Sequence, residues 1–169
     1  MSPISTEESE NKDELRVVLT WTGEPSDLDS HLFGPIPNDY LNRFHVYFSN
    51  KTIEHEDSTY AYLDVDDTDY EGPETVTVYK LDNRDVYSYY IHNYSELDEN
   101  PNDTISKSGA RIDVYIKGQY RESFFAPVGV GGTLWHVFDY NAATDTLLPV
   151  NEMSYQSNED FNDRMTSDE

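Results

Sequence analysis

The chain contains no cysteine among its 169 residues. This absence excludes a disulfide framework and any metal site built from thiolates. A metal ion could therefore be held only by carboxylates, imidazoles, carbonyls or water.

Basic residues are also scarce. The chain has 11 Lys and Arg against 34 Asp and Glu, which gives a formal net charge of −23. Phosphate backbones need a surface of the opposite sign, so we expect no nucleic-acid partner, and anionic membranes are disfavoured for the same reason. General solubility of a surface protein and adaptation to high salt are two further explanations of this charge. Cation binding therefore has to be argued from particular clusters.

Long apolar runs and catalytic motifs are absent as well. No run of about 18 apolar residues is present, so the sequence predicts no membrane span, and no charged-then-apolar signal peptide opens it. There is no Gly-x-Ser-x-Gly elbow, P-loop or His-Glu-x-x-His motif. The glycine-rich stretch at residues 129–132 precedes a predicted strand rather than a helix, so we interpret it as a turn. The sequence predicts a protein that is not an enzyme.

Tyrosine, by contrast, is abundant, with 14 residues. Tyrosine suits half-buried strand surfaces, and short alternating segments separated by turn residues follow one another along the chain. We expect strands over residues 15–21, 27–33, 44–48, 61–63, 75–79, 86–94, 110–116, 120–126 and 134–140. No segment keeps a period of about 3.6 residues. The prediction is an all-β antiparallel sandwich of about eight or nine strands, with a barrel as the alternative.

Both ends of the chain are polar and acidic. They contain too few large apolar side chains to offset the entropy of ordering, although Tyr155, Phe161 and Met165 are exceptions. We therefore expect a flexible acidic linker over residues 1–14, a sandwich domain over 15–150 and a flexible acidic tail over 151–169. The linker-like beginning indicates a segment of a larger multidomain protein.

Two acidic segments carry the clearest functional signal. In the first, strand alternation places Asp27, Asp29 and His31 on one face. The second, residues 64–74, has six carboxylates in eleven residues. Calcium takes roughly six to eight oxygen ligands, which acid-rich loops supply densely. A solvated strand face and an acidic surface loop are the alternatives. We expect both segments to bind one calcium ion, through Asp27, Asp29, Asp64, Asp66 and Asp67.

Three further side chains are candidate ligands of the same ion, namely His31, His45 and Glu74. Imidazoles among the carboxylates would make a mixed nitrogen and oxygen site, which favours a transition metal. The strand histidines His31, His45, His92 and His136 have an alternative role as hydrogen-bonded structural groups. We expect calcium in preference to a transition metal.

These motifs together resemble the YfaP-like family of bacterial secreted and surface domains of unknown function. The resemblance covers about residues 15–140. It rests on residues 27–32, 44–47, 50–51, 63–68, 72–75, 89–95, 108–110 and 135–138. The family pattern carries another glycine before Gly-Pro-Glu, where this chain has Asp69-Tyr70-Glu71. The resemblance implies an exported β-sandwich appended to other modules.

The sequence thus predicts a calcium-binding module of a larger bacterial surface or secreted protein, which serves adhesion or architecture and binds an unidentified protein or glycan. The alternative is a carbohydrate-binding module with a structural calcium, in which exposed tyrosines stack on sugar rings. The candidates for stacking are Tyr47, Tyr87, Tyr89, Tyr90 and Tyr94. A metal-dependent hydrolase is a third hypothesis, and it would need an open metal position inside a pocket.

Overall fold

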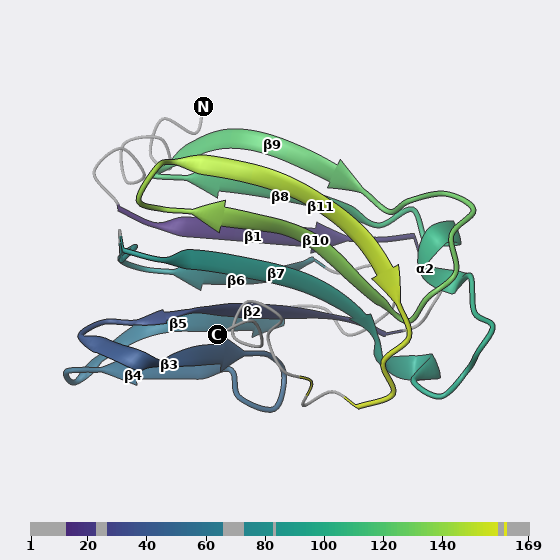
Figure 1. Cartoon of the computed structure of the whole chain (residues 1–169), viewed down its shortest axis with the longest axis horizontal. Helices are drawn as coiled ribbons and strands as arrows, with labels where there is room; N and C mark the ends of the chain where they lie inside the picture. Colours follow the sequence, from purple (N-terminus) through teal and green to yellow (C-terminus); the bar gives the residue numbers. More distant parts are fainter. Residues whose placement is uncertain (1–12, 23–26, 66–72, 83, 159–160, 162–169) are drawn as a thin grey trace.

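The computed structural model describes residues 13–22, 27–65, 73–82, 84–158 and 161. These residues form two antiparallel sheets packed face to face, and Figure 1 looks onto their flat faces, with one sheet behind the other. One sheet has the strand order β4-β5-β6-β1-β8-β9, and the other has the order β11-β10-β7-β2-β3. The expected all-β sandwich is confirmed, and the described residues contain eleven strands rather than eight or nine.

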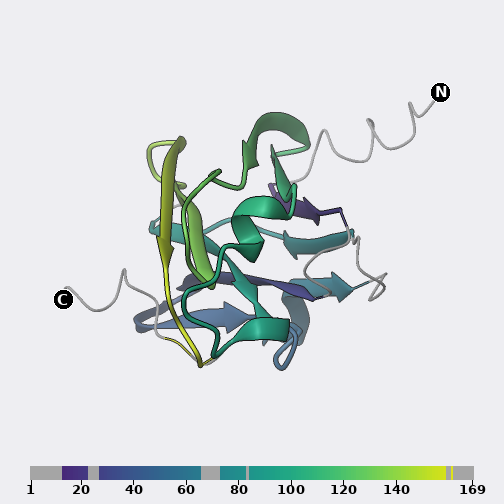
Figure 2. The same cartoon turned by 90° about the vertical axis from the view of Figure 1, so that its right-hand side faces the viewer.

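The six-stranded sheet consists of β1 (Leu15–Thr20), β4 (Thr52–His55), β5 (Ser58–Val65), β6 (Glu74–Val78), β8 (Arg111–Ile116) and β9 (Gln119–Phe125). The five-stranded sheet consists of β2 (Leu28–Ile36), β3 (Asp39–Val46), β7 (Val86–Asn93), β10 (Leu134–Asn141) and β11 (Thr146–Ser154). Two short helical turns, η1 (Tyr94–Glu96) and α2 (Thr104–Lys107), connect β7 to β8 at one end of the sandwich (Figure 2). None of the helices described is long and apolar enough to cross a membrane.

Alternation along the strands determines the core. In β1, Leu15, Val17 and Leu19 are fully buried, whereas the residues between them are only half-buried. β1 is hydrogen-bonded to β6 on one side and to β8 on the other, so it forms the centre of its sheet. The largest fully buried side chains are aromatic, led by Trp135.

β2 continues through Gly34 and Pro35, beyond residue 33, where the predicted strand ends. β7 pairs with β2 only from Leu28 to Phe33, and beyond that point β3 is the remaining partner. Pro35, which has no N–H group, is tolerated because this part of β2 is paired on one side only. Gly34 is required by packing, because a Cβ atom there would lie 2.6 Å from Cδ2 of Tyr87.

Two edge strands were missed. β4 and β11 are the outer strands of their sheets, and much of each faces solvent, so neither shows the apolar alternation of a half-buried strand. β11 also contains Pro149, which an edge strand can accept. Because β11 runs to Ser154, the domain boundary expected at residue 150 has to be corrected.

The chain continues to pack after β11. The hydroxyl of Tyr155 accepts a hydrogen bond from the backbone N–H of Asn102 at 3.1 Å, and Phe161 is only 7% exposed. The tail expected over residues 151–169 therefore contributes the last part of β11 and a buried ring. Residues 1–12 of the expected linker lie outside the described part of the chain.

Candidate functional site

The two acidic segments meet at one end of the sandwich. The backbone N–H of Ser30 donates a hydrogen bond of 2.7 Å to Oε1 of Glu74, 44 residues further along the chain. The ladder between β2 and β3 begins only at Leu32, so the Glu74 carboxylate takes the place of a strand carbonyl at this edge of β2. Glu74 is 3% exposed. The two segments therefore touch through Ser30 and Glu74, which is a different contact from the predicted convergence of Asp27, Asp29, Asp64, Asp66 and Asp67 on one ion.

The electrostatics of this acidic end disfavour full ionisation. Burial raises the pKa of Glu74 to about 7, and the negative charge of Asp27 acts in the same direction. Burial also raises the pKa of Asp27, while a side-chain hydrogen bond with Asp29 opposes this rise. A hydrogen bond between two carboxyl groups requires a proton on one of them. A cation bound here would relieve the same repulsion that the proton relieves.

The structure does not bring Asp64 to this group. Asp64 follows the buried Leu63 in β5, so strand alternation points it to the outer face of the six-stranded sheet, where it is exposed. Asp29 belongs to the five-stranded sheet, and the expected convergence of Asp64 with it is wrong because the sandwich separates them. Asp66 and Asp67 lie outside the described residues. Among the residues described, no group of three or more His, Asp or Glu side chains is arranged to hold a metal ion.

The two candidate histidines lie in an aromatic environment on the outer face of the five-stranded sheet. His31 Nδ1 and His45 Nε2 are 2.9 Å apart and form a hydrogen bond. The ring of Phe161 covers them, with centroid distances of 4.8 Å to His31 and 5.8 Å to His45. Phe161 lies between 4.8 and 5.8 Å from every ring of a group that we call the aromatic cup. The cup consists of His31, Phe33, His45, Tyr90 and His92.

Two histidines of the aromatic cup, His31 and His92, favour the neutral form near pH 7. Burial, together with the neighbouring imidazoles, holds the pKa of His31 well below its ordinary value. Burial also lowers the pKa of His92, although its Nε2 donates a 2.6 Å hydrogen bond to the carbonyl of Gln156. Nε2 of His31 and Nδ1 of His92 are buried without a hydrogen-bond partner among the residues described. The packing role that the sequence analysis left open for His31 and His45 therefore fits their surroundings.

The tyrosines expected to stack on sugars are mostly buried. Tyr87, Tyr89 and Tyr90 are fully buried, Tyr47 is nearly so, and only Tyr94 is substantially exposed. This part of the carbohydrate-binding hypothesis is wrong, because a ring in the core offers no face to a ligand. The sequence could not separate these residues from exposed tyrosines, since both kinds occur in strands.

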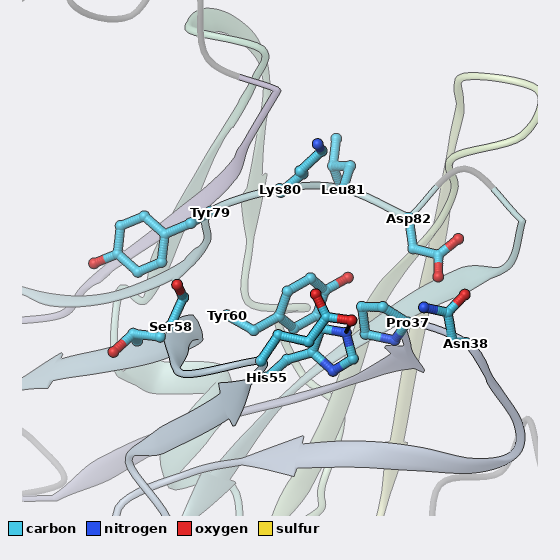
Figure 3. A pocket seen from close by; sticks show the side chains of 11 residues that line it. Pro37, Asn38, His55, Ser58, Tyr60, Tyr79, Lys80, Leu81 and Asp82 are labelled. Carbon is cyan, nitrogen blue, oxygen red and sulfur yellow. Dashed lines mark ion pairs between the residues drawn. The ribbon is translucent and has the colours of Figure 1, made fainter.

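A cavity of about 610 Å³ opens at the other end of the sandwich. Three segments enclose it, namely the β2–β3 turn, the β4–β5 turn and the residues that follow β6 (Figure 3). Tyr60, Tyr79, His55 and Asp82 are among the lining residues. This cavity was not predictable from the sequence, because the lining residues His55, Tyr60 and Tyr79 belong to no recognisable motif.

Comparisons with known proteins identify a similar fold. No protein-family model matches the chain, and no curated protein matches its sequence. A solved structure, the crystal structure of a protein of unknown function called SAV2460, resembles it with a TM-score of 0.58. The identity is 13%, over 88% of this chain and 92% of that chain, so the likeness concerns the fold alone. The fold defines the class of an antiparallel two-sheet β-sandwich.

Proposed function

We propose that this protein is a calcium-binding β-sandwich module of a larger bacterial surface or secreted protein, and that it serves adhesion or architecture rather than catalysis. The observation that carries the proposal is the hydrogen bond from Ser30 to Glu74. It joins the second acidic segment to the first, beside Asp27 and Asp29. An acidic end assembled from two distant segments is a feature that a bound cation would stabilise.

No three acidic side chains of the described residues are arranged to hold an ion, so calcium binding would have to draw the carboxylates of Asp27, Asp29 and Glu74 together. Carbonyl groups and water would complete its coordination. Its charge would replace the proton that Asp27 and Asp29 share, and it would favour the ionised form of Glu74. Asp64 has no part in this site, because it faces outward from the other sheet.

Two features of the sequence support the wider role. The resemblance to YfaP-like domains favours an exported module joined to other modules. The absence of the common catalytic motifs favours binding over chemistry. The calcium ion would then stabilise the acidic end of a module whose partner is a protein or a glycan.

Thermal unfolding in excess calcium and in chelator tests the proposal. Calcium at about 100 times its dissociation constant should stabilise the fold by about 2.7 kcal/mol, a shift of several degrees. We expect Asp29→Asn and Glu74→Gln to abolish this shift. Asp64→Asn is the matched control, and it should keep the shift in full.

Coincident wild-type curves in calcium and in chelator would refute calcium binding. A parallel measurement with zinc separates the metals. A shift with zinc but not with calcium would point instead to a mixed site of carboxylates and imidazoles.

A further inference from the structure

The cavity in Figure 3 is one part of a longer groove. A second hollow, of about 420 Å³, is lined by Thr52, Thr59, Tyr62 and Tyr79, and the first cavity shares two of these residues, Thr59 and Tyr79. Sites for small ligands measure about 300–1,000 Å³, so each hollow alone is large enough. We call the combined feature the tyrosine groove. It is defined by Thr52, Thr59, Tyr60, Tyr62, Tyr79 and Asp82.

Two exposed tyrosine rings lie along the groove. Tyr79 is 46% exposed and Tyr62 is 37% exposed. Tyr62 in β5 pairs with Thr77 in β6, two residues before Tyr79, so both rings belong to the outer face of the six-stranded sheet. The face of an aromatic ring carries partial negative charge, which attracts weakly positive C–H groups. Each ring is therefore a platform for a ligand with a flat C–H face.

The polar groups of the groove are mostly uncharged or balanced. Ser58 and Thr59 contribute hydroxyls to the first cavity, and Thr52 adds another in the second. The charged residues that line the first cavity include Lys80, Glu56 and Asp82, and the Asp82 carboxylate is paired with Arg84, at 3.0 Å between Nε and Oδ2. In a chain with a net charge of −23, this near-neutral patch of hydroxyls suits an uncharged polar ligand better than an ionic one.

Hydrogen bonds hold the groove in shape. The hydroxyls of Tyr60, on its floor, and of the buried Tyr87 are 3.1 Å apart, and the backbone N–H of Asp82 donates to Tyr87 at 2.7 Å. Arg84 bonds the Asp82 carboxylate and the carbonyl of Ile36, which precedes the β2–β3 turn. Floor and walls are thereby connected before any ligand arrives, which reduces the ordering cost of binding.

We propose that the tyrosine groove binds a neutral glycan chain. Tyr62 and Tyr79 stack on the faces of sugar rings, and the hydroxyl side chains around them bond the sugar hydroxyls. A glycan fits because its sugar rings present C–H faces, which can stack on the tyrosine rings, and uncharged hydroxyls, which can bond to the hydroxyls of the groove. The site lies at the opposite end of β2 from the acidic residues, so it does not depend on calcium binding there.

A titration of isotope-labelled full-length protein, followed by amide NMR signals, tests this inference. The probes are cellohexaose, xylohexaose, mannohexaose and chitohexaose, each added in calcium and again in chelator. We expect at least one of them to shift the signals of Thr59, Tyr62 and Tyr79 under both conditions. Failure of the calcium proposal would not change this result.

Substitutions locate the site. Tyr79→Ala should weaken binding of the active glycan by about tenfold or more, since a stacked ring is lost. Tyr120→Ala is the matched control, because Tyr120 is 56% exposed but lies on β9, away from the groove. Tyr62→Ala serves as a second groove variant, and unfolding curves confirm that each variant is folded. Absence of binding by all four glycans, shifts centred outside the groove, or unchanged affinity in both groove variants would overturn the proposal.

Discussion

Replacing Glu74 by glutamine should change how stability depends on pH. The raised pKa means that the folded state holds its proton more tightly than the unfolded state. Glu74 therefore contributes stability that is fully present below its ordinary pKa of 4.5 and is lost as pH rises through about 7. Glutamine cannot ionise, so the variant lacks this dependence while keeping an acceptor for the N–H of Ser30.

The magnitude follows from the two pKa values. Each tenfold change in proton affinity corresponds to about 1.4 kcal/mol, so the rise from 4.5 to about 7 gives about 3 kcal/mol. Relative to Glu74→Gln, the wild-type protein should thus lose about 3 kcal/mol between about pH 4.5 and pH 8. Any fixed cost of burying the amide does not alter this difference, because it is the same at every pH.

Urea unfolding at a series of pH values, in the presence of chelator, measures this difference. Carboxylates distant from Glu74 affect both proteins equally and cancel. Glu99→Gln, which removes an exposed carboxylate, is the control and should follow the wild-type curve. A gap between wild type and Glu74→Gln that stays constant over the whole range would show that Glu74 is not buried as described.

Three further substitutions test the packing. Phe161→Ala should lower the unfolding free energy by about 2–4 kcal/mol in urea, because the ring is buried in the aromatic cup, and an unchanged value would mean that the tail is dispensable. Gly34→Ala should cost about 1–3 kcal/mol by the same assay, since its Cβ would overlap Tyr87 and Phe44, whereas wild-type stability would contradict this close packing. Tyr87→Phe should cost about 1–3 kcal/mol, measured as a lower melting temperature, because the N–H of Asp82 loses its acceptor; an equal melting temperature would argue against that bond.

The central strands were predictable because they alternate. The apolar side chains of β1 recur at every second residue, and this pattern follows directly from burial on one face. β4 and β11 were not predictable, since backbone hydrogen bonds hold an edge strand in its sheet and leave no pattern in its side chains. Phe161 was placed in the flexible tail for a related reason. A single ring in a polar segment shows no periodicity, and its burial depends on aromatic rings that other strands supply.

For the acidic site, the direction of side chains within each strand was predictable, but the arrangement of the strands relative to one another was not. Alternation along β2 correctly directs Leu28 and Leu32 to the core, and it groups Asp27 with Asp29. Alternation along β5 could also have shown that Asp64 points away from the core beside Leu63. What the sequence could not reveal is that β2 and β5 belong to different sheets, so that outward means opposite directions for Asp29 and Asp64.

The position of Phe161 has a mechanical consequence. β1 starts at Leu15 at one end of the sandwich and β11 finishes at Ser154 at the other (Figure 1). The ring of Phe161 packs against His31, on the outer face of the five-stranded sheet. A stretching force applied through Leu15 and Phe161 would first pull the ring from the aromatic cup. Once the hydrogen bonds of Tyr155 and Gln156 also break, seven residues would be released, and they extend by up to about 24 Å at about 3.4 Å each. Further tension would act along β1 and β11 and load their hydrogen bonds in shear, so the domain would yield a short length of chain before either sheet bears the load.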